Sequence, residues 1–179
     1  SIHKFDVLCI DRRTGKILWQ RTACEELPHE GHYRIRGTFA SASPVTDGEQ
    51  VYAYFGSRGL YCYDMEGNLK WKRELGKLYM RMSFGEGSSP ALHADTLVIN
   101  WDHEGDSFIV ALDKSTGEQR WKVPRDEPTS WSTPLVRERP LLARRPVLLR
   151  PGSAGDVEVH PGDIHVLDVV VHELRGRAG

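Results

Sequence analysis

The sequence predicts an all-β protein, a partial β-propeller of four-stranded antiparallel blades with an atypical C-terminal tail. Two observations carry this prediction. A motif of two apolar runs joined by a glycine-containing turn occurs three times in the 179 residues. A short Ser/Thr-Pro element precedes two of its copies and recurs after the third. The repeat period of about 50 residues is typical of propellers and solenoids.

Each copy of the motif reads as a β-hairpin. The copies span 7–19, 60–71 and 109–121, and each is an apolar run ending in Asp, a turn with Gly and a second run ending in Trp. Glycine supplies the positive φ of a tight turn, and the Asp carboxylate can accept hydrogen bonds from N–H groups of that turn. We expect structural roles at nine repeat positions: Asp11, Gly15, Trp19, Asp64, Gly67, Trp71, Asp113, Gly117 and Trp121.

The repeated tryptophan favours docking of one blade on the next. The alternative is an exposed aromatic platform for a ligand. Identical placement in every unit suits a repeated interface better than a single binding site.

The second repeated element opens each unit. It reads Ser43-Pro44-Val45, Ser89-Pro90-Ala91 and Thr133-Pro134-Leu135. A turn and an apolar strand follow the first two copies, at 50–55 and 96–101, so one unit has four strands. We therefore predict an incomplete propeller over 1–136, with part of a blade at 1–21, blades at 38–75 and 84–123, and the start of another at 129–136.

These motifs resemble the bacterial PQQ-like (quinoprotein alcohol dehydrogenase-like) β-propeller repeat family. The resemblance covers roughly residues 5 to 136, and Asp113, Gly117 and Trp121 carry it best. It implies the propeller fold and leaves two function classes open, because the family contains quinone-dependent dehydrogenases and non-catalytic scaffolds.

Of these two classes, we expect the non-catalytic one. The expected protein is a fragment of a periplasmic or otherwise extracytoplasmic scaffold that binds protein or a small ligand through its loops, with no cofactor. The alternative is part of a PQQ-dependent dehydrogenase that oxidises alcohols or sugars with PQQ and Ca²⁺. The sequence contains no adjacent Cys pair, which often accompanies that cofactor in the family, and no Asp can be matched to the catalytic position.

Composition narrows the range of partners. The net charge of -1 gives no reason to expect nucleic acid as a partner, and no apolar run approaches the ~20 residues of a membrane helix.

The three cysteines do not suggest a disulfide. Cys9 and Cys62 share a repeat position with Ala111, which predicts buried thiols, and Cys24 stands alone in a loop. The chain begins inside a blade, so we expect the natural protein to start upstream and this open arc to self-associate.

Three groups of polar residues are candidate sites. Asp102-His103-Glu104-Gly105-Asp106 is the densest and could bind a cation, but we favour a solvated turn. His29, Glu30 and His32 lie in a long loop (22–37), where we favour ordinary polar loop residues over a metal site. Arg34, Arg36, Arg81 and Arg125 precede blade-opening strands and could bind an anion, but solvated surface charge is the preferred interpretation. We expect Tyr79-Met80-Arg81-Met82 to pack at a blade connection.

The tail at 137–179 breaks the pattern. It is rich in Arg and Pro and contains neither Lys nor Trp. We interpret it as a frame-shifted or fused segment, or as disordered; a divergent Pro-rich capping tail is the alternative. By propensity, residues 164–171 could form a strand.

Overall fold

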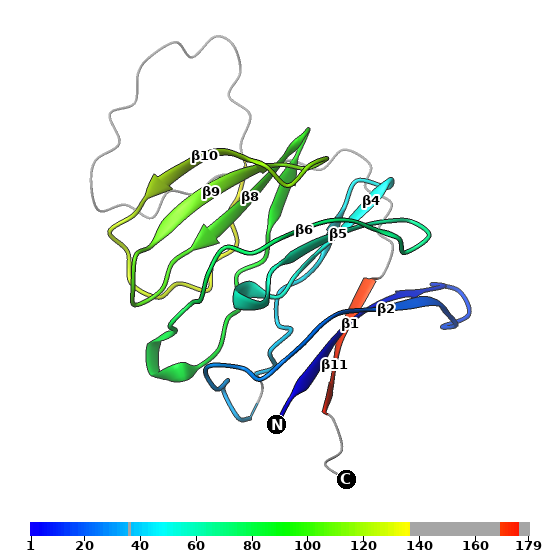
Figure 1. Ribbon diagram of the computed structural model, residues 1–179, viewed down its shortest axis with the longest axis horizontal. Coiled ribbons are helices and arrows are strands. Elements are labelled where there is room, and N and C mark those ends of the chain that lie inside the picture. Colours follow the sequence, from blue (N-terminus) through cyan, green and yellow to red (C-terminus); the bar gives the residue numbers. More distant parts are fainter. Residues whose placement is uncertain (36, 137–168, 176–179) are drawn as a thin grey trace.

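The computed structural model describes residues 1–35 and 37–136 and the backbone of 169–175. Within these residues the protein is all-β, apart from the short 3-10 turns η1 (Gly56–Arg58) and η2 (Arg81–Ser83). Three antiparallel sheets fan out and face one another in succession (Figure 1). The predicted fold, a partial β-propeller of four-stranded blades, is confirmed.

Each sheet follows the order of its strands in the chain, except at the edge of the first. The first sheet has the order β11 (Val169–Arg175), β1 (His3–Ile10), β2 (Ile17–Glu26). The second is β3 (Val45–Thr46), β4 (Gln50–Tyr54), β5 (Leu60–Asp64), β6 (Leu69–Arg73). The third is β7 (Ala91–His93), β8 (Thr96–Trp101), β9 (Phe108–Asp113), β10 (Gln119–Pro124).

Most strand predictions agree with these bounds. β8 and β9 span the predicted residues, and β3 and β7 begin directly after Pro44 and Pro90, because proline cannot donate to the ladder. Two expectations fail. β2 continues to Glu26, into residues expected to be loop, and Thr133-Pro134-Leu135 adopts no strand although it lies within the described part of the chain.

The tail contributes one described strand. β11 pairs antiparallel with β1, with Val171 opposite Val7 in the register. Only the first residues of β11, 169–171, overlap the strand predicted at 164–171. The first sheet therefore has a third strand, beyond the two expected from the sequence. Residues 137–168 and 176–179, on which the other interpretations of the tail rest, lie outside the described residues.

Alternating side chains of β4 bury both faces of the second sheet. Ala53 packs toward Phe5 and Val7 of the first sheet. Tyr52 and Tyr54 point the other way, into a cluster that contains Leu97, Ile99, Trp101 and Val110 of the third sheet. This period-two alternation places an apolar layer between each pair of blades.

Tryptophan docks each blade on the turn of the next. The Trp19 indole N–H donates to Met65 O at 2.8 Å, and the Trp71 indole N–H donates to Lys114 O at 3.0 Å. Each ring also covers a glycine of that turn, since a Cβ on Gly117 would lie 2.6 Å from Trp71. Trp121, on the last described sheet, is 44% exposed.

The aspartate of each repeat holds its own turn. One carboxylate oxygen of Asp113 accepts N–H groups of Ser115 (2.8 Å) and Thr116 (3.1 Å), and those of Asp11 and Asp64 do the same in their turns. The pKa of Asp113 is lowered by its hydrogen bond with Arg120 and then by these N–H groups.

The Ser/Thr-Pro element links neighbouring blades at the opposite, inner rim. Ser43 N–H donates to Ser89 Oγ at 2.9 Å, and Ser89 N–H donates to Thr133 Oγ1 at 3.2 Å. The hydroxyl of each unit thus accepts a hydrogen bond from a backbone N–H of the unit before it. This need of the backbone for a partner explains why the element recurs with the blades.

We predict that Gly117→Ala destabilises the protein much more than Gly15→Ala. Both glycines occupy the same repeat turn at φ 71° and 69°, but nothing lies within 4 Å of a Cβ on Gly15. Gly15→Ala should therefore cost about 1 kcal/mol for the left-handed backbone alone. Gly117→Ala should cost about 1–3 kcal/mol more, because the methyl group displaces Trp71. Urea denaturation of the full chain measures both, and equal losses would show that the Trp71 contact contributes little.

Candidate functional site

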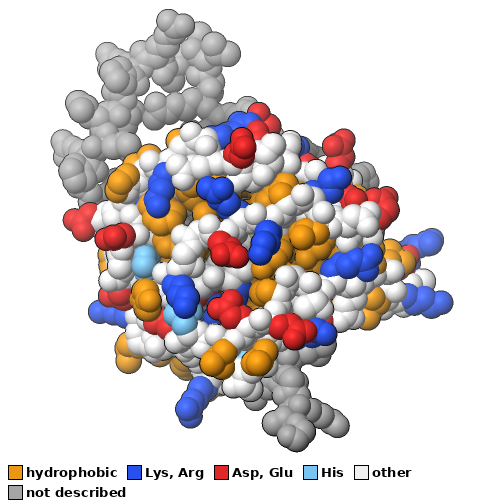
Figure 2. Space-filling view, viewed as in Figure 1, with side chains coloured by type: hydrophobic (Ala, Val, Ile, Leu, Met, Phe, Trp, Pro, Cys, Tyr) orange, Lys and Arg blue, Asp and Glu red, His pale blue; other side chains and the backbone are white. Residues whose placement is uncertain are grey.

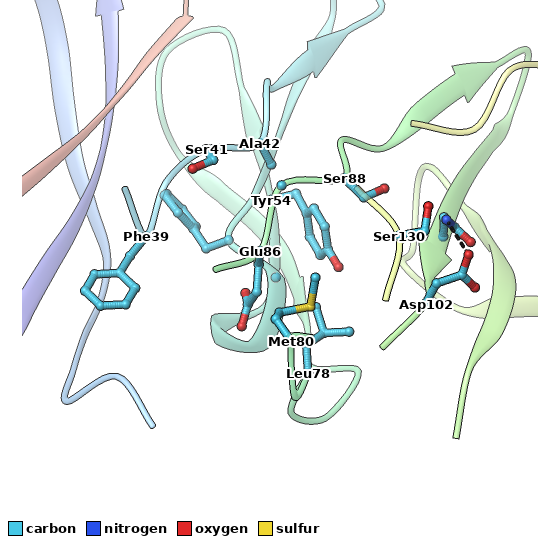
Figure 3. Close-up of a pocket in the computed structure, with 14 residues that line it drawn as sticks. Phe39, Ser41, Ala42, Tyr54, Leu78, Met80, Glu86, Ser88, Asp102 and Ser130 are labelled. Atoms are coloured by element: carbon cyan, nitrogen blue, oxygen red, sulfur yellow. Dashed lines mark hydrogen bonds between the residues drawn. The ribbon is translucent and has the colours of Figure 1, made fainter. Parts of the chain in front are cut away.

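A small pocket lies where the second and third sheets meet, at the rim from which β3 and β7 begin (Figure 3). Its apolar lining includes Phe39, Leu78 and Met80, and Glu86 lies between Phe39 and Met80. The other lining residues come from the ends of β4 and β8 and from the segments that lead into the innermost strands. They include Tyr54, Gly56, Ser88, Asn100, Asp102 and Ser130.

Glu86 is held in a buried ion pair at one end of the pocket. Its carboxylate lies 3.0 Å from Arg58 Nη1 and accepts both N–H (2.9 Å) and Oγ–H (2.6 Å) of Ser57. The side chains of Arg58 and Glu86 are 2% and 11% exposed. The Arg58 guanidinium also covers the rings of Phe5 and Phe39, 5.5 Å and 5.0 Å from their centroids. The pair therefore connects the first sheet, the β4–β5 turn and the segment before β7.

Asp102 forms the corresponding pair in the next blade. Its carboxylate accepts hydrogen bonds from Arg125 Nε (2.8 Å) and Nη2 (3.2 Å), and from the Asn100 side-chain amide (2.9 Å). The expected solvated turn at 102–106 is therefore wrong for its first two residues: Asp102 and His103 are buried, whereas Glu104, Gly105 and Asp106 are exposed. Arg125 likewise is not a free surface charge.

Two polar atoms of the pocket lining have no hydrogen-bond partner. They are the Tyr54 hydroxyl and the Asn100 side-chain carbonyl, both on buried side chains. Burial, followed by the charge of Glu86, raises the pKa of Tyr54 well above its ordinary value, so the hydroxyl stays protonated. The carboxylates of Glu86 and Asp102 are each matched by one guanidinium, which leaves the pocket with little net charge.

The long loop between β2 and β3 anchors the next inter-blade segment. The His29 ring donates to Leu78 O at 2.7 Å, and Glu30 accepts the Met80 N–H at 2.9 Å. The His32 ring meets Phe39 edge-on at 4.6 Å. These three side chains do not converge on one point. Each contacts a different partner in the chain, so these residues help to fix the loop and are not merely solvated polar side chains as expected.

The segment Tyr79-Met80-Arg81-Met82 packs only in part. Met80 is buried in the core between the second and third sheets, as expected. Tyr79 is 53% exposed, yet its ring meets His29 edge-on at 5.5 Å and stacks on His103 at 6.3 Å. Arg81 and Met82 are exposed, which corrects the packing prediction for these two residues. Arg34 and Arg81 are exposed as predicted, and Arg36 lies outside the described residues.

Cys9, Cys62 and Ala111 are buried at their shared repeat position, and Cys24 is half-buried; all three thiols are free. Burial raises the pKa of the Cys62 thiol to about 12.

Among the described residues, no group of three or more His, Cys, Asp or Glu side chains is placed to hold a metal ion. None of the described helices is long and apolar enough to cross a membrane.

Sequence reasoning missed Arg58 and Glu86. A usable signal existed, because Arg58 stands in a short turn, Gly56-Ser57-Arg58-Gly59, between two apolar strands that leave a long cation little route to solvent. Glu86 carries no local signal, since its role depends on a contact with the preceding blade.

The chain is similar to one protein family and to solved structures. The model of a family described as "Outer membrane protein assembly factor BamB" matches residues 3–157. No curated protein matches the chain. A solved europium-containing methanol dehydrogenase has a TM-score of 0.47 and 13% identity, covering 69% of this chain and 22% of that protein. BamB from Moraxella catarrhalis has a TM-score of 0.41 and 22% identity, covering 66% and 30%. The chain spans less than a third of either structure.

We predict that Glu86→Gln destabilises the protein by about 3 kcal/mol, because it leaves the Arg58 charge buried without a counter-ion. Glu74→Gln is the matched control, since Glu74 pairs with Lys72 at 3.5 Å on the surface and is 74% exposed. It should cost no more than about 0.5 kcal/mol. Chemical denaturation of both variants provides the comparison, and a small loss for Glu86→Gln would mean that the pair is not needed.

Tyr54→Phe should be neutral or stabilising by up to about 1 kcal/mol, because it removes a buried hydroxyl without a partner. Tyr61→Phe, the control, deletes a hydroxyl that donates to Arg58 O at 2.9 Å in an equally buried place. This variant should lose about 1 kcal/mol. If thermal melts showed equal losses, the Tyr54 hydroxyl would have a partner in solution, such as a bound water.

Proposed function

Because the chain belongs to the family of the outer membrane protein assembly factor BamB, we propose that it forms part of a non-catalytic β-propeller that binds other proteins through its loops. We further propose a periplasmic location in a bacterium. The observation that carries both proposals is the family match over residues 3–157, which includes every described strand except β11.

The described residues are consistent with a binding role. The side chains of β4, β5, β8 and β9 that face neighbouring sheets are used to stack the blades. The acidic groups of the pocket are neutralised from within the chain by Arg58 and Arg125. The loops that join the blades are available to a partner, as is common when a rigid scaffold carries function.

Deleting the gene in a bacterium that encodes the complete protein tests the proposal. We expect β-barrel proteins of the outer membrane to fall in abundance while soluble periplasmic proteins do not, with recovery when the intact gene is restored. Quantitative mass spectrometry of the outer-membrane fraction gives this readout. Unchanged abundances would contradict the assembly role.

An activity assay on the complete protein, after purification, distinguishes the scaffold from the dehydrogenase alternative. When PQQ and Ca²⁺ are added, we expect no dye-linked oxidation of alcohols or sugars. Turnover above that of a protein-free control would contradict a non-catalytic role.

A further inference from the structure

Two neighbouring loops expose six large apolar side chains. Leu27, Tyr33 and Ile35 belong to the connection between β2 and β3, and Tyr79, Met82 and Phe84 to the connection between β6 and β7; all six are 41–77% exposed. We call these six residues the loop surface. Its two halves are joined, because Tyr33 N–H donates to Phe84 O at 2.9 Å and their rings meet edge-on at 5.4 Å.

The charge that these loops present outward is positive. Arg34, Lys77 and Arg81 are exposed. Of the acidic side chains in the same loops, Glu74 is also exposed and pairs with Lys72 of β6 at 3.5 Å, whereas the other two are turned to internal partners. Glu30 accepts the Met80 N–H, and Glu86 is held by Ser57 and Arg58. Figure 2 shows hydrophobic and cationic side chains, with acidic side chains among them, at the end of the molecule where Figure 1 places these loops.

The apolar side chains are displayed on a backbone that is fixed and strained. Met82 and Ser83 both have positive φ, 53° and 52°, which non-glycine residues rarely adopt. The segment around them is held from three sides: Glu30 binds Met80 N, the His103 ring accepts Tyr79 N–H at 3.1 Å, and Thr129 Oγ1 accepts Arg81 N–H at 2.9 Å. Strained residues that the surroundings enforce are typical of ligand-binding segments.

We propose that the loop surface docks a protein segment rich in apolar and acidic side chains. Large exposed apolar patches with a polar rim mark interaction sites, and the three cations complement acidic groups. A lipid surface is the weaker fit, because basic clusters that bind anionic lipid contain about 4–8 cations. This inference rests on the proposed function and deepens it by naming the surface and the chemistry of the partner.

Two glycine substitutions test the surface in the full chain. Met82→Gly removes an exposed apolar side chain and relieves the strained φ at the same time, whereas Ser83→Gly relieves the strain and leaves the loop surface intact. Both variants should therefore melt at a higher temperature than the parent, and only Met82→Gly should bind its partner less well. Leu69→Ser removes a side chain that is 52% exposed on β6, away from these loops, and serves as the control.

Fluorescence anisotropy with defined probes gives the binding readout. The probes are a labelled peptide that alternates leucine with glutamate, the same peptide with lysine in place of glutamate, and vesicles containing phosphatidylglycerol. We expect only the glutamate peptide to bind, about tenfold more weakly to Met82→Gly. Ser83→Gly and Leu69→Ser should keep the parent's affinity.

Several results would overturn the inference: equal binding of both peptides, no binding of the glutamate peptide, binding of the vesicles that depends on Met82, or unchanged affinity of Met82→Gly. Its failure is distinguishable from failure of the proposed function. If gene deletion lowers the abundance of outer-membrane proteins and any of these results is found, the partner binds the protein at a surface other than the loop surface. Unchanged outer-membrane proteins together with Met82-dependent peptide binding would retain the surface and reject the assembly role.

Discussion

The structure depends on the fact that the second sheet has two apolar faces and that a neighbouring sheet covers each of them. Tyr52 and Tyr54 on one face of β4, and Ala53 on the other, are all almost completely buried. A single blade cannot achieve this alone, so stability comes from each neighbour that covers a face. The other repeated features serve this contact: they fix the distance and angle at which one sheet meets the next.

Two sets of hydrogen bonds, at opposite rims, set that geometry. At the outer rim, an indole N–H of one blade reaches a backbone carbonyl in the turn of the next, and glycine beneath the ring permits the close approach. At the inner rim, a Ser or Thr hydroxyl accepts an N–H from the previous blade. Because a sheet held at both rims cannot rotate against its neighbour, the apolar side chains between them stay in register.

The sequence predicted the features that repeat as local motifs and missed the charge pairs, which form between residues far apart in the chain. The strands, the turns and the burial of Cys62 follow from local pattern, because the same physical requirement recurs in each unit. Arg58 and Glu86 are 28 residues apart and meet only after two blades stack, so no local pattern predicts their pairing. Asp102 was placed in water for the same reason: its partner, Arg125, comes from beyond the following hairpin.

The buried charges also explain where function can reside. The β4–β5 turn carries a cation that pairs with an anion before β7, and the β8–β9 turn carries an anion that pairs with a cation after β10. Each inter-blade segment is therefore tied to the turn beside it by a pair that is costly to break. A segment fixed in this way does not need apolar side chains of its own for stability. Met82 nevertheless stands 76% exposed on such a segment, and the proposed contact with a partner would give its exposure a physical reason.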